Sequence, residues 1–493
     1  MRPDSLWRIP DFRTLFAATA LTQLGTNVGY VAVPLVAVSA LDAGPGQAGL
    51  LATLSTLAFL LIGLPAGAWV DRMRHRRVLI VADLAKALLY ASVPLAWWLG
   101  GLTLGQLYAV ALLTGAATVF FDVGSQSVLP GLVGREHLVD ANAAVVGLMA
   151  VGNVAGRGAG GMLVQLLGAP SAIVATALSH LGSALRLTAL RPAPATPTAK
   201  PLPTPVPVPV PVPVSAPVSA PVSAPVSAPV SAPIAGPGLG PRIAEGLRHV
   251  LGNPRLRALA ATAALNNLGS QLVNTLLPVL FVRELHLPAA ALGLFWAVGG
   301  VGILLGSRCA RPLSARLGDG RTLALAGLCT APAGLLVPLI AGGPWLLPAG
   351  AGWLLLSFKT GMDNVLGVSL RQRMTPDPLL GRMNATFRFL LTGALAVGSA
   401  LSGLLGELLG VRAALWLGGA VLATAFLPVH LSPLRSRRAA VPTGAPVTPG
   451  ATSGAAQATA LAAAPATAPV RRRGPAASPA PGSDADGGCA PAC

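Results

Sequence analysis

The sequence predicts an all-α membrane protein of twelve transmembrane helices, arranged as two parallel six-helix repeats. Three observations lead there: the composition, the spacing of long apolar runs, and the distribution of Lys and Arg. Of the 493 residues, 53% are hydrophobic and 10% are charged, against roughly 25% charged in an average soluble domain. A soluble fold of this length has too little interior to hide that apolar surface, so a lipid bilayer is the expected surroundings.

Twelve apolar runs are each long enough to cross a hydrocarbon core of ~30 Å as a helix. The first six lie at about 14–40, 47–70, 78–99, 104–129, 139–167 and 170–190. The second six lie at about 258–282, 288–311, 321–342, 344–370, 384–408 and 411–432.

The positive charges predict the orientation of these helices. With the N-terminus inside, the cytoplasmic segments hold 29 of the 34 Lys and Arg residues, and the outer loops hold only Arg283 and Arg412. The other three, Lys86, Arg157 and Lys359, fall inside apolar runs. Cytoplasmic loops of membrane proteins carry such an excess, and an odd number of helices would destroy it. We therefore expect both termini in the cytoplasm.

The composition also limits location and partners. Arg outnumbers Lys by 31 to 3, and Ala, Gly and Pro abound, which indicates a GC-rich bacterial genome and hence the bacterial inner membrane. The net charge of +18 would suit a nucleic-acid binder, but its cations would then cluster on a polar, aromatic-bearing surface. Here they stand between apolar runs, so no nucleic-acid partner is expected. A monomer is the expected state.

Four segments are expected along the chain. An N-terminal six-helix half (1–191) precedes a Pro-rich cytoplasmic linker (192–241). A C-terminal half with a leading amphipathic helix (242–434) precedes a disordered cytoplasmic tail (435–493). Proline at this frequency excludes a helix or packed sheet and favours an extended polyproline II spacer. The alternative is a docking site for a proline-recognising partner.

An internal repeat relates the two halves. LGTNVGYVAVP (Leu24 to Pro34) matches LGSQLVNTLLP (Leu268 to Pro278), at an offset of 244 residues. Further along, Asp122 precedes Asn142 by 20 residues, and Asp363 precedes Asn384 by 21. Because six crossings separate the copies, the halves share one orientation. Parallel six-helix repeats around a midplane cavity describe the major facilitator architecture.

One motif makes this resemblance specific. GAWVDRMRHRRVLIVADLAKALL, from Gly67, is similar to the signature between helices 2 and 3 of major facilitator transporters. In that family, an Asp and basic residues at this place form a cytoplasmic gate. The matching residues here are Asp71, Arg72, Arg76 and Arg77. The second half carries a degenerate copy, RPLSARLGDGRTL, with Asp319 displaced toward the next helix.

Other stretches resemble the bacterial exporter branch that includes siderophore and macrolide efflux proteins. These stretches are FFDVGSQSVLPGLV, LVDANAAV, SLRQRMTPDPLLGRMNATFRFL and SPLR. The resemblance covers roughly residues 8–435 without the linker. It implies export by alternating access, with a cavity lined by helices 1, 4, 7 and 10. The family's antiporters usually carry a Gly-Pro pair in helix 5, whereas this chain has Arg157 where the Pro would stand.

Polar residues at helical spacing mark the candidate cavity. They are Gln23, Asn27 and Tyr30 on helix 1, with Asn267, Gln271 and Asn274 on helix 7. Amides in hydrocarbon need partners, so these side chains face either water in a substrate cavity or a neighbouring helix. The equivalent depth of the two sets favours the cavity, to which we also assign Lys359.

Charged residues within the apolar runs form the second candidate set. Asp83 with Lys86, and Lys359 with Asp363, are spaced to pair along one helix face. Asp83, Asp122 and Asp363 lie roughly 8–10 Å from the cytoplasmic helix ends, which favours a gate cluster with Asp71 over a midplane proton site. The deeper cations Lys359 and Arg157 indicate an acidic group on the substrate. Arg157 could instead bind backbone carbonyls.

The remaining sequence indicates no enzyme chemistry. The six histidines show no metal-ligand spacing and no phosphate-binding Walker loop is present, so neither metal nor cofactor is expected. The leading hypothesis is a secondary transporter that couples proton entry to efflux of a small molecule, such as a drug, siderophore or secondary metabolite. One alternative is a solute uptake symporter. Another, of a different class, is a non-transporting membrane scaffold or receptor.

Overall fold

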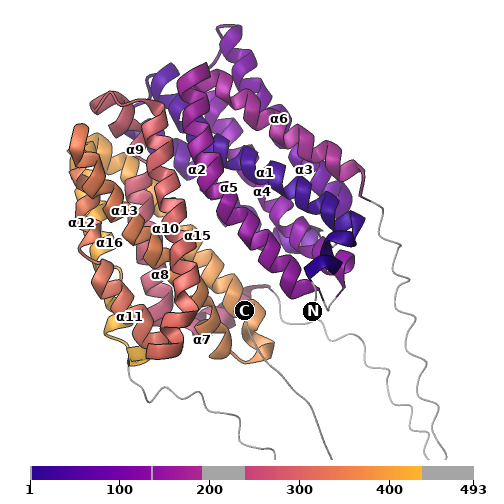
Figure 1. Cartoon of the computed structure of the whole chain (residues 1–493), viewed down its shortest axis with the longest axis vertical. Coiled ribbons are helices and arrows are strands. Elements are labelled where there is room, and N and C mark those ends of the chain that lie inside the picture. Colours follow the sequence, from indigo (N-terminus) through magenta and orange to yellow (C-terminus); the bar gives the residue numbers. More distant parts are fainter. Residues whose placement is uncertain (1–2, 71, 135–136, 191–238, 436–493) are drawn as a thin grey trace, which may run out of the picture. The chain divides into compact units, whose positions relative to one another are not determined.

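The computed structural model describes residues 3–70, 72–134, 137–190 and 239–435 (Figure 1). Every predicted apolar run is helical, and no strand occurs within these ranges. The predicted linker, apart from its last three positions, and the predicted tail, apart from Arg435, lie outside the described residues.

The first six helices follow the predicted runs closely. They are α1 (Pro10–Leu35), α2 (Pro45–Val70), α3 (His75–Trp98), α4 (Leu104–Val133), α5 (Leu138–Leu167) and α6 (Ala169–Thr188). A short 3₁₀ turn, η1 (Pro3–Arg8), precedes them. Prolines occupy the first turn of α1 and α6, where their missing N–H costs no hydrogen bond.

The second half is more interrupted. Its helices are α7 (Leu239–Gly252), α8 (Pro254–Asn274), α9 (Leu277–Val279), α10 (Ala289–Leu317), α11 (Asp319–Thr330), α12 (Ala333–Leu336), α13 (Leu346–Met362), α14 (Val368–Arg373), α15 (Leu380–Leu409), α16 (Val411–Thr424) and α17 (Leu427–His430). Short 3₁₀ turns are η4 (Val337–Leu339), η5 (Gly343–Trp345), η7 (Asp377–Leu379) and η8 (Pro433–Arg435). The predicted run 321–342 breaks between α11 and α12 at Pro332, because a proline inside a helix removes one hydrogen bond and clashes with the preceding turn.

Eight helical segments of the described residues are apolar and long enough to cross a membrane by length and composition alone. Helices α5, α6, α8 and α13 are not among them. The first three carry Arg157, His180 and the Asn266–Asn267 pair within their length, and α13 ends after 17 residues at a π-helical turn. Polar residues thus lower the hydropathy of α5, α6 and α8, whereas α13 is too short.

The repeat is visible in the local backbone. A π-helical turn follows the proline of each Leu-Gly…Pro motif, at η2 (Val36–Ala40) and η3 (Leu280–Glu284). The connections that follow contain the positive-φ residues Asp42 (φ 51°) and His286 (φ 52°). Both features, the turn and the positive-φ residue, recur at the offset of 244 residues. The predicted fold class, two parallel six-helix repeats, is confirmed.

Two seams join the halves, one between α2 and α15 and the other between α5 and α10. We call the end that holds the α1–α2 and α15–α16 connections the outer end, following the predicted orientation, and the opposite end the inner end. There, a Cβ added to Gly403 would lie 2.8 Å from the Gly49 Cα, and one on Gly161 would lie 2.8 Å from the Gly293 Cα. Such close approach of two helix backbones is possible because all four residues lack a side chain.

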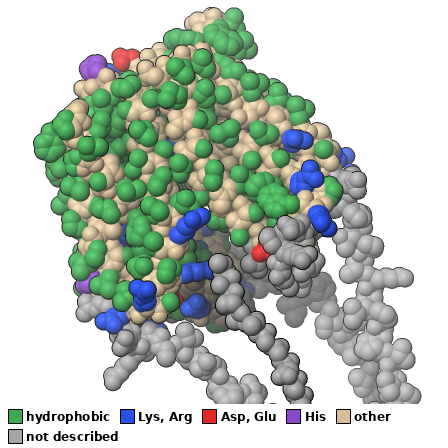
Figure 2. Space-filling view, in the orientation of Figure 1, with side chains coloured by type: hydrophobic (Ala, Val, Ile, Leu, Met, Phe, Trp, Pro, Cys, Tyr) green, Lys and Arg blue, Asp and Glu red, His purple; other side chains and the backbone are tan. Residues whose placement is uncertain are grey.

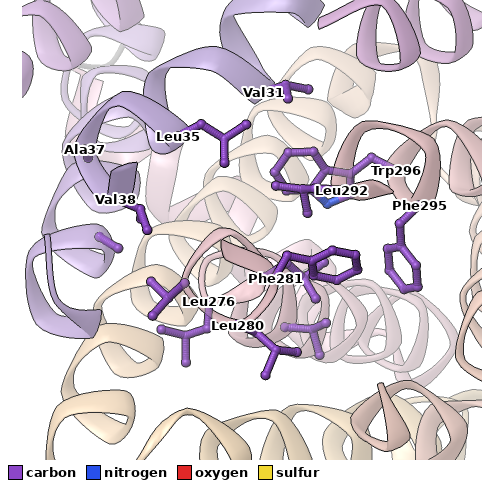
Figure 3. Close-up of a cluster of buried hydrophobic side chains, with 14 of the residues drawn as sticks. Val31, Leu35, Ala37, Val38, Leu276, Leu280, Phe281, Leu292, Phe295 and Trp296 are labelled. Carbon is purple, nitrogen blue, oxygen red and sulfur yellow. The ribbon is translucent and has the colours of Figure 1, made fainter. Parts of the chain in front are cut away.

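A shared apolar core lies beside these close contacts (Figure 3). It brings Val31 and Leu35 of α1 together with Leu280, Phe281 and Trp296 of the second half. Packing at this density excludes water, so the outer end is sealed between the halves.

Toward the inner end the two seams lose these close backbone contacts, although side chains of α2 and α15 still line one pocket there, among them Phe59 and Arg388. On α5, a Cβ added to Gly147 would meet nothing within 4 Å, and the same holds for Gly63 on α2. Figure 2 shows most Lys and Arg side chains toward the bottom and the right-hand side of its face, where the inner ends of the helices lie.

Candidate functional site

A chain of polar and aromatic contacts crosses from one half to the other. The Arg157 Nε donates to the Asn27 Oδ1 at 3.3 Å, and its guanidinium lies 4.5 Å from the centre of the Tyr30 ring. The Tyr30 ring meets the Trp296 ring edge-on at 5.0 Å between centroids. The Trp296 Nε1 in turn donates to the Asn274 Oδ1 at 2.8 Å. We call these five residues the central contact chain.

The central contact chain contains four residues that the sequence predicted for the site. Arg157 binds a side chain and an aromatic ring, and no hydrogen bond from it to a backbone carbonyl is found within the described ranges. Trp296 was missed, because nothing in its apolar run marks it as the partner of Tyr30. The arrangement offers a cation and aromatic faces where the halves meet.

Two other predicted cavity residues lie on the same helices, nearer the inner end. Gln23 is one turn before Asn27 on α1, and its carbonyl accepts from the Asn27 Nδ2 at 2.9 Å. Gln271 precedes Asn274 on α8 by three residues, and both glutamines are half-buried. At the offset of 244 residues Gln23 corresponds to Asn267 and Gln271 to Asn27, so the two glutamines lie about one helical turn apart in depth.

Asn267 and Lys359 occupy a different place, a cavity of about 150 Å³ inside the second half. Helices α8, α11, α13, α14, α15 and α17 contribute to its wall. The buried Lys359 forms an ion pair with Asp363, and the Asn267 Nδ2 donates to the Leu391 carbonyl at 3.2 Å. The predicted cavity residues therefore divide between the central contact chain and this second-half cavity.

A fully buried polar cluster occupies the interior of the first half. The Asp83 carboxylate accepts hydrogen bonds from Thr22 at 2.7 Å and from Ser183 at 2.5 Å. It also faces the Lys86 Nζ at 2.8 Å and the His180 Nδ1 at 3.2 Å. No member of this Asp83 cluster is more than 3% exposed. One carboxylate thus ties α1, α3 and α6 together.

The side chains of the Asp83 cluster point into the first half, whereas the predicted gate would place them between the two halves. Asp83 and Lys86 do pair, as their spacing indicated, but they point into their own bundle. The sequence analysis missed Thr22, His180 and Ser183. A signal for His180 existed, because an ionisable residue inside a membrane span is a functional candidate by default.

The basic residues that follow α2 lie at the inner end. Arg76 donates from Nε to the Leu187 carbonyl at 3.4 Å and from Nη2 to the Thr188 carbonyl. A cation there satisfies the last carbonyls of α6. Arg72 and Arg77 are exposed, and Asp71 lies outside the described residues.

Asp122 is half-buried on α4. Its carboxylate interacts electrostatically with Lys86 and with Arg388 of α15. The Arg388 guanidinium lies 5.7 Å from the Phe59 ring of α2, so this arginine reaches the first half.

Polar contacts reinforce the apolar seal at the outer end. The Glu407 carboxylate accepts from the Gly46 N–H at 3.1 Å. Arg283 donates to the Ala43 carbonyl at 3.0 Å and lies 3.3 Å from the Asp42 carboxylate. Each contact joins the second half to the first half.

Two parallel six-helix bundles that meet along a polar centre and seal at one end define a membrane transporter. The chain belongs to the Major Facilitator Superfamily, whose family model matches residues 15–362. It is a multi-pass transporter of small molecules and not an enzyme.

Several curated relatives are exporters. The chain is 26% identical over 450 residues to the enterobactin exporter EntS of Citrobacter koseri, a match that covers 89% of this chain and 96% of EntS. It is 32% identical over 193 residues to the multidrug efflux pump Tap of Mycolicibacterium fortuitum, covering 37% of this chain. That second match spans 46% of Tap, which is less than half the pump.

Solved structures share the fold. A bacterial homologue of the iron transporter ferroportin in an inward-facing state matches with a TM-score of 0.65 at 18% identity, over 88% of this chain and 100% of that chain. The nucleoside transporter NupG matches with a TM-score of 0.65 at 11% identity, over 85% of this chain and 99% of that chain.

Proposed function

We propose that the protein is a secondary exporter that moves a small molecule out of the bacterial cytoplasm in exchange for protons. The cargo class is a drug, siderophore or secondary metabolite. The observation that carries the proposal is the sealed outer end, with backbone contacts between the halves that loosen toward the inner end, in a chain whose relatives include an enterobactin exporter and a multidrug efflux pump.

The cargo enters from the inner end and reaches the central contact chain. Export requires the halves to rock, so that the outer seal opens and the inner ends meet. The rocking motion must separate Tyr30 from Trp296 and Glu407 from Gly46. Each contact is weak, at about 0.5–2 kcal/mol, which allows the cargo to shift the balance between the two states.

The inner gate is formed by Asp71, Arg72 and Arg77 after α2, together with Asp122 on α4. Arg76 holds this loop against the end of α6. A negative Asp122 attracts Arg388 of the other half and draws the inner ends together. A proton on Asp122 removes that attraction, which couples the pH gradient to the opening of the inner gate.

A comparison of bacterial cells with and without the gene tests the direction of transport. Cells that lack the gene should retain more of at least one drug or secreted metabolite and tolerate less of it. Compound levels inside the cells are measured by mass spectrometry. Lower internal levels in cells without the gene would instead establish uptake, and unchanged levels across a broad panel would remove the transport proposal.

A further inference from the structure

We propose that the cavity inside the second half is a binding site for a carboxylate group on the transported molecule. This inference rests on the proposed function, because it names the chemistry of the cargo. The carboxylate would lie between Lys359 and Arg371 and replace Asp363 as the partner of Lys359.

The charges around the cavity favour a single negative group. Among the residues that line it, Lys359 and Arg371 are cationic and Asp363 is the acid, which leaves one net positive charge. Lys359 is only 3% exposed. An ion this deeply buried needs a counter-charge nearby, because water cannot solvate it.

Two donors at the cavity are buried without an acceptor. The Thr262 Oγ1 and the Arg371 Nε have no hydrogen-bond partner, although both residues line the wall. Thr262 is only 6% exposed. A buried polar group left unpaired costs about 1–3 kcal/mol, and a bound carboxylate would supply acceptors to both. A cationic ligand would supply none.

Comparison of the two repeats shows which acidic residue the second half lacks beside Lys359. At the offset of 244 residues, Asp83 of the first half corresponds to Gly327 on α11. A Cβ added to Gly327 would collide with the Phe426 Cβ and would lie 3.5 Å from the Lys359 Cε, so Phe426 fills the space beside this glycine. The neighbouring helix therefore presents no carboxylate where the first half has one, and Lys359 depends on Asp363 of its own helix.

The local backbone widens the wall at this place. A π-helical turn, η6 (Asp363–Gly367), separates α13 from α14, and its members Asn364 and Gly367 line the cavity. Turns of this kind within α-helices frequently occur at functional sites. The turn begins at Asp363, the residue that the ligand must displace.

The size of the cavity suits part of a molecule. A volume of about 150 Å³ holds roughly ten water molecules, which is enough for a carboxylate with a short hydrocarbon or one ring. Phe387, Leu391 and Phe426 supply apolar wall beside the charges. A larger cargo would place its acidic end here and its body toward the boundary between the halves.

Ligand-induced stabilisation of the purified full-length protein in detergent tests the site without any transport. Acetate, propionate and benzoate are added at matched ionic strength, with benzamide as the neutral analogue of benzoate and chloride as an inorganic anion. We expect benzoate to raise the melting temperature and benzamide to leave it unchanged. No stabilisation by any of the three carboxylates, or equal stabilisation by chloride, would overturn the proposal.

Variants distinguish binding from a general effect on the fold. Lys359→Met should abolish the benzoate effect and Lys359→Arg should retain it. Asp363→Asn should strengthen benzoate binding at least several-fold, because it removes the competing carboxylate. Arg316→Gln, which removes an exposed cation outside the cavity, should leave binding unchanged. Weaker binding in Asp363→Asn would contradict the displacement.

The two proposals fail in different ways. Carboxylate binding with the expected variant pattern, in a protein whose cells show uptake, would retain the site and reject export. Export without carboxylate binding would retain the function and reject the site.

Discussion

Asp83 shows how one residue can organise a bundle inside a membrane. Its carboxylate accepts hydrogen bonds from two hydroxyl groups and lies within ion-pair distance of two basic side chains. Lys86 also lies 4.6 Å from the Phe121 ring centre. Removing either charge leaves the other buried without compensation, which is the costly way to alter such a pair.

We therefore expect Asp83→Asn to destabilise the purified protein by about 3–5 kcal/mol. Lys86→Met should cost a similar amount, and the double variant should recover much of the loss, because it leaves no lone charge. Denaturant unfolding in detergent measures all three. Additive losses in the double variant would show that the pair is not the source of the stability.

Asp122 carries a separate prediction for the coupling of protons to transport. Asp122→Asn mimics the protonated carboxyl and no longer attracts Arg388. Export should then lose most of its dependence on the pH gradient while the protein still inserts and folds. Transport into inverted vesicles, with and without an imposed gradient, measures this. Unaltered gradient dependence would remove Asp122 from the gate.

At the scale of elements, the glycine pairs of the two seams decide which end closes. A side chain at Gly403 must displace the backbone of α2, because a Cβ there already lies 2.8 Å from the Gly49 Cα. We expect Gly403→Leu to prevent closure of the outer end and to reduce export at least tenfold. Gly350→Leu on α13 serves as the control, because a Cβ there meets nothing within 4 Å and α13 belongs to neither seam.

Cysteine labelling from outside the cell reports the result. In a protein whose native cysteines are replaced by serine, a cysteine at Trp296 should react faster in the Gly403→Leu background. Equal labelling in both backgrounds would show that the close contact of α2 and α15 does not control access.

Helix positions were largely predictable from the sequence, because long apolar runs and the charge count act locally. The positions at which the helices are interrupted were less predictable. Pro332 is visible in the sequence, but the π-helical turns at Val36–Ala40 and Asp363–Gly367 depend on packing around them. The one-residue difference between the Asp-to-Asn spacings, 20 against 21, arises in the connection between the helices, which is longer between α14 and α15 and contains η7.

The sequence predicted which residues belong to the candidate site better than it predicted the contacts between them. Repeat spacing identified Asn27, Tyr30 and Asn274, but only tertiary packing shows that Trp296 joins them. Likewise, Asp83 was recognised as a buried acid, whereas its hydroxyl partners come from helices about 60 and 100 positions away in the chain. Contacts of that range leave no local pattern.

At the scale of the whole molecule, the two halves must move as bodies joined by a chain. The linker, residues 192–241, enters the mechanism only as this connection. Deleting residues 192–235 should therefore leave most export activity, provided the remaining residues still span the gap between the halves. Drug tolerance of cells with the shortened protein measures this. Complete loss with normal membrane levels would favour the docking or scaffold role.

The contrast between Asp83 and Gly327 bears on how such a transporter could be redesigned. The first half balances its own interior charge, so substitutions there act mainly on stability. The second half contains the cavity, and substitutions in its wall do not disrupt a hydrogen-bonded cluster like that of Asp83. Altered cargo preference should thus be sought on α13, α14 and the facing part of α8, with the first half kept as an unvaried partner.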